Sequence, residues 1–165
     1  IKIAKIGDKI NDEIYKLIKD RKDVTMLNIF ACYGYGEKEN RFPSYAITQV
    51  LKNQEITINQ NCIFDYLWVE DMEKIVEYFI ENIPNDNVIN ITPTQSVSLE
   101  NIAKIVKCFT NKQINIKILT GVLNNEYTGD NSLLLKNYPD IQFTDIKDGL
   151  KKLFKYNQNS IEVKL

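Results

Sequence analysis

Apolar residues recur three or four positions apart in five stretches of the chain, which places them on one face of a helix in each stretch. Ser98 has the residue type and position of an N-cap, and Glu70 and Asp71 suit the first turn of a helix because carboxylates complement its dipole. The tail from Asn157 onward is expected to be frayed. The predicted helices cover residues 3–18, 42–51, 70–80, 98–109 and 146–154.

Shorter apolar or alternating stretches between the helices predict strands. Val24–Phe30 has the apolar content of a buried strand, whereas Glu55–Ile58 alternates as a half-exposed one. Further strands are predicted at 88–91, at 114–119 and in the apolar segment that begins at Phe64. Strands that alternate with helices in this way predict an α/β fold.

One carboxylate interrupts the apolar segment Phe64–Val69. Asp65 is flanked by Phe64 and Tyr66, and burying a carboxylate costs free energy unless hydrogen bonds or an opposite charge satisfy it. Asp65 therefore predicts either a ligand or a structural role in bracing a loop, and both possibilities stay open at this point.

The segment after the first predicted strand is a second candidate for binding. It carries two glycines and several charges over residues 34–40, and loops at the carboxyl ends of strands in open α/β sheets are common ligand sites. Arg41 follows it and is one of only two arginines. Because arginine binds phosphate in a bidentate manner, Arg41 is a candidate for anion recognition.

Composition excludes several classes of protein. The 165 residues, 44% of them hydrophobic, suffice for one compact unit over residues 1–165. A net charge of −1 with scattered lysines indicates neither nucleic-acid nor membrane-surface binding. Histidine is absent and the three cysteines are far apart, which disfavours His-based catalysis, a metal site and a disulfide framework. No apolar run is long enough for a membrane span, and a cytoplasmic location is expected.

Several segments in order resemble the carboxy-terminal half of the extended short-chain dehydrogenase/reductase family, the NAD-dependent epimerases and dehydratases that modify nucleotide sugars. Leu-Asn-Ile-Phe-Ala-Cys-Tyr-Gly-Tyr-Gly at 27–36 looks like the family strand that ends in Asn-x-Tyr-Gly-Pro-Gly, and 41–47 like the helix after it. Phe-Asp-Tyr-Leu-Trp-Val-Glu-Asp-Met at 64–72 is similar to the family segment Arg-Asp-Phe/Tyr-Ile-x-Val-x-Asp. Residues 90–103 match a family strand and helix.

The resemblance implies the last core strands and helices of a Rossmann-like fold together with the small mixed α/β substrate lobe. It also implies hydride transfer with NAD or NADP in the full-length enzyme, a nucleotide-diphosphate sugar as substrate and a homodimer. It places Phe30 near the nicotinamide, with core packing as the alternative. The residues that it implies for substrate binding are Arg41, Phe42, Ile56, Ile58, Phe64, Tyr66, Tyr127 and Asp130.

For part of this set another role stays open. Ile56 and Ile58 would surround the base and ribose, but plain core packing is the usual fate of such residues. Tyr127 and Asp130 would lie near the sugar diphosphate, or would belong to a loop turn bonded to its own backbone.

The sequence also departs from the family pattern. Asn28 stands where the family usually has arginine, Ala31 where it has a substrate-contacting asparagine, Tyr35 where it has proline, and Phe64 where an arginine often touches the diphosphate. The first, second and fourth of these changes remove a polar contact. Arg41 or Tyr127 would then supply more of the phosphate recognition.

No catalytic residue is predicted within this chain. Tyr15 and Lys19 have the family's Tyr-x-x-x-Lys spacing but lie at the end of the first helix, where the family has its pair at the beginning. Lys5 would pair with Ile1, which cannot move a proton, and Lys2 would need a tyrosine before the first residue. No Gly-x-x-Gly-x-x-Gly follows an early strand, so tight NAD binding and activity are not expected of this chain alone.

Three hypotheses follow. The first is the substrate-binding portion of a longer nucleotide-sugar epimerase, dehydratase or reductase, with motifs closest to those of surface-polysaccharide pathways. The second is a binding module without catalysis, and the third is a structural subunit that pairs through its first helix.

Overall fold

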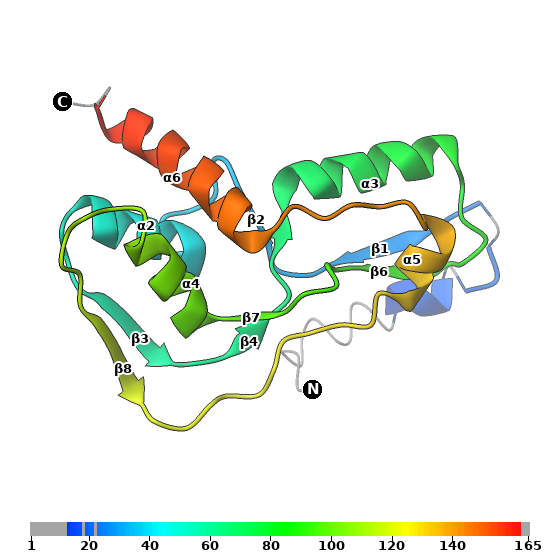
Figure 1. The fold of residues 1–165 in the computed structure, drawn as a ribbon. Coiled ribbons are helices and arrows are strands. Elements are labelled where there is room, and N and C mark those ends of the chain that lie inside the picture. The colour runs from blue at the N-terminus through cyan, green and yellow to red at the C-terminus, as the bar shows by residue number, and fades with distance from the viewer. Residues whose placement is uncertain (1–12, 18, 22, 163–165) are drawn as a thin grey trace.

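The computed structural model describes residues 13–17, 19–21 and 23–162, which form two lobes joined by short strands (Figure 1). Residues 13–17 are helical, in agreement with part of the predicted first helix. The remainder of that helix lies outside the described residues, as do Ile1, Lys2 and Lys5. The fold contains parallel strands and helices, so the α/β prediction is confirmed.

The first lobe is built on two parallel strands. β1 (Met26–Ile29) pairs with β6 (Val88–Ile91), with Asn28 opposite Asn90. The helices α3 (Val69–Glu81) and α5 (Ser132–Asn137) lie along these strands in Figure 1. Their apolar residues share one buried cluster, which comprises Leu67, Ile75, Phe79, Ile89, Ile91, Leu134 and Ile141.

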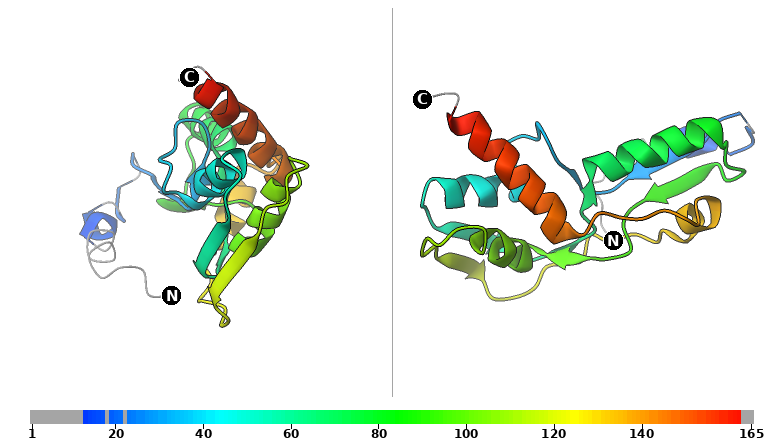
Figure 2. Two further views of the ribbon diagram at one scale, coloured as in Figure 1. Left: turned by 90° about the vertical axis from the view of Figure 1, so that its left-hand side faces the viewer. Right: turned by 45° about the horizontal axis from the view of Figure 1, so that its top comes forward.

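The second lobe also contains a parallel pair. β3 (Ile56–Gln60) pairs with β8 (Ile116–Thr120). Three helices pack together beside this pair, namely α2 (Phe42–Leu51), α4 (Leu99–Lys107) and α6 (Ile146–Glu162), as Figure 2 shows. Burial of their apolar faces with Ile56 and Ile58 makes the larger core of the molecule.

Two short strand pairs connect the lobes. β2 (Cys32–Tyr33) pairs in parallel with β5 (Leu67–Trp68), and β4 (Ile63–Phe64) pairs in antiparallel with β7 (Val97–Ser98). The single strand expected around Asp65 is therefore wrong in detail, because the ladder stops at Asp65 and Tyr66. Asp65 is turned inward to bind side chains and backbone from other segments, and this interrupts regular pairing.

The two ends of helices that the sequence predicted have different outcomes in the structure. Ser98 is the N-cap of α4 as predicted, and its hydroxyl accepts a hydrogen bond from the Asn101 N–H at 3.1 Å. The expected fraying from Asn157 onward is wrong, because α6 continues to Glu162. The Tyr156 ring packs against Tyr35 at 5.1 Å, and the Tyr156 carbonyl accepts a bond from the Ser160 hydroxyl, so this part of the helix is held by contacts.

Among the described residues, no helix is both long and apolar enough to cross a membrane.

Candidate functional site

Six of the nine predicted binding residues line one cavity of about 500 Å³, which lies between the two lobes. We call it the central cavity. Its walls come from the end of β1, the start of α2, β4 with Tyr66, the first residue of α4, and the segment around Tyr127. The complete lining is Ile29, Phe30, Ala31, Asn40, Arg41, Phe42, Phe64, Tyr66, Leu99 and Tyr127. Its volume is in the range of small-molecule sites.

A second hollow of about 400 Å³, the side cavity, adjoins the first along β3. The two share Asn40, Phe42 and Leu99 as lining residues. Thr57, Ile58 and the other residues of the side cavity come from β3 and α2, and they extend the available space beyond Phe42. A ligand with two connected parts could therefore occupy both.

The aromatic walls of the central cavity are held by contacts between rings. The Tyr127 ring lies 5.8 Å from the Phe30 ring and 5.6 Å from the Phe64 ring, between centroids. The Phe64 and Tyr66 rings are 5.4 Å apart. These separations are favourable for aromatic pairs, so the four side chains form one continuous wall.

Backbone hydrogen bonds place Tyr127 beside β4. The Tyr127 N–H donates to the Ile63 carbonyl at 2.8 Å, and the Asp65 N–H donates to the Tyr127 carbonyl at 3.3 Å. The segment from residue 124 to 129 is thus docked next to β4 although it is more than 60 residues away in sequence.

Asp65 supports this wall from inside. Its side chain is only 2% exposed, and its carboxylate accepts bonds from the Thr92 hydroxyl at 2.9 Å, the Ser96 hydroxyl at 2.5 Å and the Gly129 N–H at 2.7 Å. Because three donors satisfy the buried charge, no ligand is needed to explain Asp65. Of its two suggested roles, the structure supports the bracing of loops.

Arg41 presents the main cationic group of the central cavity. It is exposed, and within the described part of the chain its guanidinium makes no hydrogen bond or ion pair. Arg41 is also the N-cap residue of α2, at the positive end of the helix dipole. An uncommitted guanidinium beside a helix start can bind a phosphate.

Glu37 organises this helix start. Arg41 makes no side-chain cap, and Glu37 Oε1 instead accepts the Ser44 N–H at 3.0 Å in the first turn of α2. The other oxygen, Oε2, is buried and has no hydrogen-bond partner. Burial raises the pKa of Glu37 above its usual 4.5, while the Ser44 hydrogen bonds and the Arg41 charge oppose this rise.

Replacing Glu37 with glutamine is expected to remove a pH dependence of stability. The raised pKa means that the folded protein binds the proton more tightly than the unfolded chain, so this favourable contribution is present in acid and is lost as the pH rises through the folded pKa. The side-chain oxygen of glutamine can still accept the Ser44 N–H, but glutamine carries no charge. We expect Glu37→Gln to be more stable than the parent at neutral pH, by up to about 1 kcal/mol.

Urea unfolding near pH 4 and near pH 7 measures this difference. Glu39→Gln in the same loop is the control, since Glu39 is exposed. A difference that is the same at both pH values would show that the charge of Glu37 is not responsible.

Three of the predicted residues lie outside the central cavity. Ile56 is fully buried in the core and Ile58 is 1% exposed, although Ile58 contributes to the wall of the side cavity. The Asp130 carboxylate accepts bonds from the Ser132 N–H at 2.9 Å and the Ser132 hydroxyl at 3.0 Å, which lower its pKa. In this structure Ile56 is thus a core residue, and Asp130 is bonded within its own turn, which are the alternative roles given for them in the sequence analysis.

The structure adds residues that the patterns did not reveal. Asn40 and Leu99 line both cavities, and the only available signal was the position of Asn40 next to Arg41. Asp71 was expected only as a first-turn residue, yet it is 1% exposed and accepts bonds from the Thr144 N–H at 2.6 Å and hydroxyl at 3.0 Å. It therefore fixes the segment that leads into α6.

One residue expected near a nicotinamide lines the central cavity. Phe30 reaches the central cavity, but the sequence has no glycine-rich turn to cradle a pyrophosphate. Tyr15, the tyrosine with the Tyr-x-x-x-Lys spacing, is 50% exposed and does not line the cavity. Within the described ranges, no three or more Cys, Asp or Glu side chains gather as a metal ion would need.

Comparison with known proteins shows a family match over part of the chain and a shared fold over most of it. A model of the NAD dependent epimerase/dehydratase family matches residues 12–92. No curated protein sequence matches the chain. UDP-glucuronic acid 4-epimerase from Bacillus cereus, solved with UDP-glucuronic acid and NAD, is 19% identical and superimposes with a TM-score of 0.77. The match covers 93% of this chain and 50% of the epimerase.

Two other solved enzymes are similar to a comparable degree. TunA, an NAD-dependent NDP-hexosamine 5,6-dehydratase involved in tunicamycin biosynthesis, is 18% identical, with 93% of this chain and 53% of TunA covered and a TM-score of 0.74. UDP-glucose 4-epimerase from Thermotoga maritima, solved with UDP-glucose, is 19% identical, with 95% and 52% covered and a TM-score of 0.72.

The chain spans about half the length of these solved structures. At such identities the likeness establishes the fold, which is the expected part of a Rossmann-like extended short-chain dehydrogenase/reductase. Residues 12–92 match the NAD dependent epimerase/dehydratase family, and the chain shares the fold of these solved enzymes.

Proposed function

We propose that this chain is the substrate-binding portion of an NAD- or NADP-dependent nucleotide-sugar epimerase, dehydratase or reductase. The observation that carries the proposal is the free Arg41 guanidinium in one cavity with the Phe64, Tyr66 and Tyr127 rings. A diphosphate would bind Arg41, and the sugar would lie against the aromatic wall. The base would extend past Phe42 into the side cavity, where Ile58 and Thr57 supply an apolar and a polar contact.

In this proposal the chain binds and orients the substrate and does not carry out the chemistry. NAD would supply hydride transfer in a full-length enzyme, and the proton-transfer pair and the dinucleotide site would lie in the half of such an enzyme that this chain does not span. The isolated chain is then inactive. Sugar biosynthesis for surface polysaccharides, a cytoplasmic location and a homodimer remain part of the proposal, on the resemblance of the motifs alone.

A binding module without catalysis is the second candidate, and one contact favours it. Asn28, which stands in place of the family arginine, donates through Nδ2 to Asn90 Oδ1 at 3.1 Å. Asn90 in turn donates to the Asp130 carbonyl at 3.1 Å. This position is thus used for internal bonding, which is compatible with binding but removes one charged contact to substrate.

Replacing Arg41 with alanine tests the proposed function. We expect the affinity of the full chain for UDP-glucose to fall by about 10- to 100-fold, because a charge-assisted bidentate contact to the diphosphate is lost. Uridine, which has no phosphate, should bind the variant and the parent equally. Isothermal titration calorimetry measures both affinities.

Lys52→Ala is the matched control, since Lys52 is an exposed cation at the other end of α2. If Arg41→Ala and Lys52→Ala bind UDP-glucose with the affinity of the parent, the central cavity is not the diphosphate site. An enzyme and a binding module are then distinguished by the coding sequence upstream of Ile1. A glycine-rich turn and a Tyr-x-x-x-Lys there support the enzyme, whereas an initiator Met directly before Ile1 contradicts it.

A further inference from the structure

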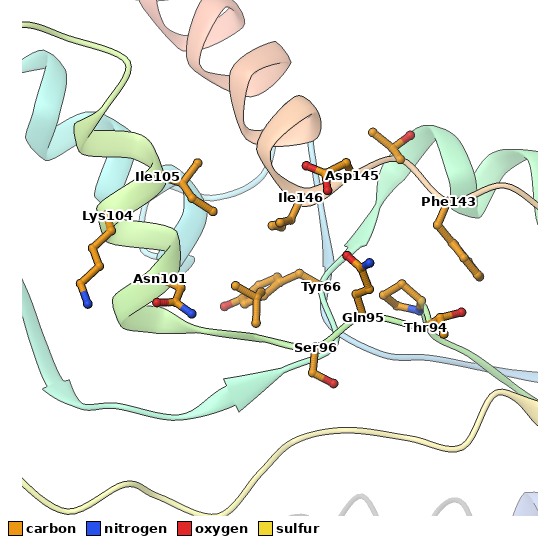
Figure 3. A pocket seen from close by; sticks show the side chains of 13 residues that line it. Tyr66, Thr94, Gln95, Ser96, Asn101, Lys104, Ile105, Phe143, Asp145 and Ile146 are labelled. Atoms are coloured by element: carbon orange, nitrogen blue, oxygen red, sulfur yellow. The ribbon is translucent and has the colours of Figure 1, made fainter.

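A third cavity, of about 530 Å³, lies between α4, the start of α6 and the loop that joins β6 to β7 (Figure 3). We call it the helix-side cavity. Of its lining residues only Tyr66 also lines the central cavity, so the two spaces are separate. The side chains that define its chemistry are Tyr66, Gln95, Asn101, Lys104, Phe143 and Asp145.

Several polar groups in this cavity have no partner within the described part of the chain. Neither the Tyr66 hydroxyl nor the side-chain amides of Gln95 and Asn101 make a hydrogen bond there, and Figure 3 shows the three residues around one space. Burial raises the pKa of Tyr66, so its hydroxyl stays protonated and can donate. Two amides and a hydroxyl provide both donors and acceptors for a ligand.

The charges around the cavity do not select an anion. Lys104 Nζ is 2.6 Å from Glu100 Oε1, so its positive charge is already compensated. On the opposite side, Asp145 Oδ1 accepts the Lys147 N–H at 2.8 Å, and no arginine lines the space. A phosphate would therefore meet no free cation, in contrast to the central cavity with Arg41.

Apolar surface completes the site. Phe143 provides an aromatic side chain, and Ile105 and Ile146 provide aliphatic ones. Amides and hydroxyls together with an aromatic side chain match a molecule that carries many hydroxyls on a C–H framework.

We propose that the helix-side cavity binds a neutral polyhydroxylated molecule, that is, a sugar without charged groups. This site shares only Tyr66 with the proposed nucleotide-sugar site and does not depend on that site, because its side-chain amides come from Gln95 and Asn101. A free sugar and the end of a glycan chain share this chemistry.

The test is a titration of the full chain with N-acetyl-D-glucosamine and D-glucose, followed by amide NMR. The side-chain amide signals of Gln95 and Asn101 should shift in a saturable manner at millimolar sugar. D-glucose 6-phosphate, which carries a negative charge, should bind several-fold more weakly. Tighter binding of a tetrasaccharide than of the monosaccharide would identify a glycan end as the ligand, and weaker binding a free sugar.

Two substitutions check the location. Asn101→Leu and, separately, Gln95→Ala in the loop should each weaken sugar binding by about tenfold, equivalent to about 1.4 kcal/mol. Asn115→Leu is the control, because Asn115 is exposed and lines none of the three cavities. Tyr66 is left intact because it also lines the central cavity.

The affinity for UDP-glucose, measured in parallel, separates this inference from the proposed function, since neither substitution touches the central cavity. The inference is overturned if neutral sugars cause no saturable shift, if D-glucose 6-phosphate binds more tightly than D-glucose, or if both folded variants bind sugar as the parent does.

Discussion

Alanine in place of Asp65 is expected to lower the free energy of unfolding by about 3–5 kcal/mol, the largest effect of any substitution considered for this protein. The carboxylate is 2% exposed and joins three segments, through Thr92, Ser96 and Gly129. Removing it leaves the buried Thr92 hydroxyl, the Gly129 N–H and the Ser96 hydroxyl without their acceptor. Such unpaired groups cost more than an ordinary hydrogen bond contributes.

Urea unfolding followed by circular dichroism measures the loss. Asp140→Ala serves as the control because Asp140 is an exposed carboxylate in a turn. Asp65→Asn should lose less than Asp65→Ala, since the amide oxygen still accepts from one or two of the donors. A loss below about 1 kcal/mol for Asp65→Ala would mean that the segments around the central cavity hold together without this carboxylate.

Gly129→Ala is expected to disturb the central cavity directly. A Cβ added at Gly129 would lie 2.5 Å from Cζ of Phe30 and within 3.0 Å of two further ring atoms. The Gly129 backbone cannot easily retreat, because its N–H donates to Asp65 at 2.7 Å. The Phe30 ring must therefore move, and it lies in the wall of the cavity beside Tyr127.

We expect Gly129→Ala to destabilise the fold by about 1–3 kcal/mol, as overpacking commonly does. The affinity for UDP-glucose should fall by about tenfold in the folded variant, since the ring moves at the ligand site. Gly121→Ala is the matched control, because no atom lies within 4 Å of the Cβ position at Gly121. Affinity and stability equal to those of the parent would show that Phe30 has room to move away from both Gly129 and the ligand.

The predictions that succeeded depended on interactions between near neighbours in sequence. Ser98 caps α4 through Asn101, three residues later, and this contact needs no other part of the chain. The helix of residues 42–51 and the strand of residues 88–91 have the predicted bounds, because periodicity and the proline at the helix start already favour them.

Sequence patterns were insufficient to predict the role of a residue whose contacts come from a distant segment of the chain. Asp71 satisfies the rule for a first-turn acid, but its partner Thr144 is 73 residues away, so its buried role could not be predicted. The helical continuation of α6 past Asn157 likewise accompanies a contact between Tyr156 and Tyr35. Ile56 was a candidate for ligand binding but lies in the core. The alternation of a strand does not reveal which apolar residues face a ligand and which face the core.

The sequence by itself determined the α/β class, the order of the longer elements, the family resemblance and most of the residues around the central cavity. Amphipathic spacing and local capping are sufficient for the first two, because they act within one or two turns of the chain. Only the tertiary structure decided that Asp65 binds Thr92, Ser96 and Gly129, and that Arg41 is left free beside the aromatic wall. The Gly129 bond and the position of the Tyr127 ring depend on the docking of the segment around Tyr127 next to β4, which is a long-range packing arrangement that no local pattern encodes.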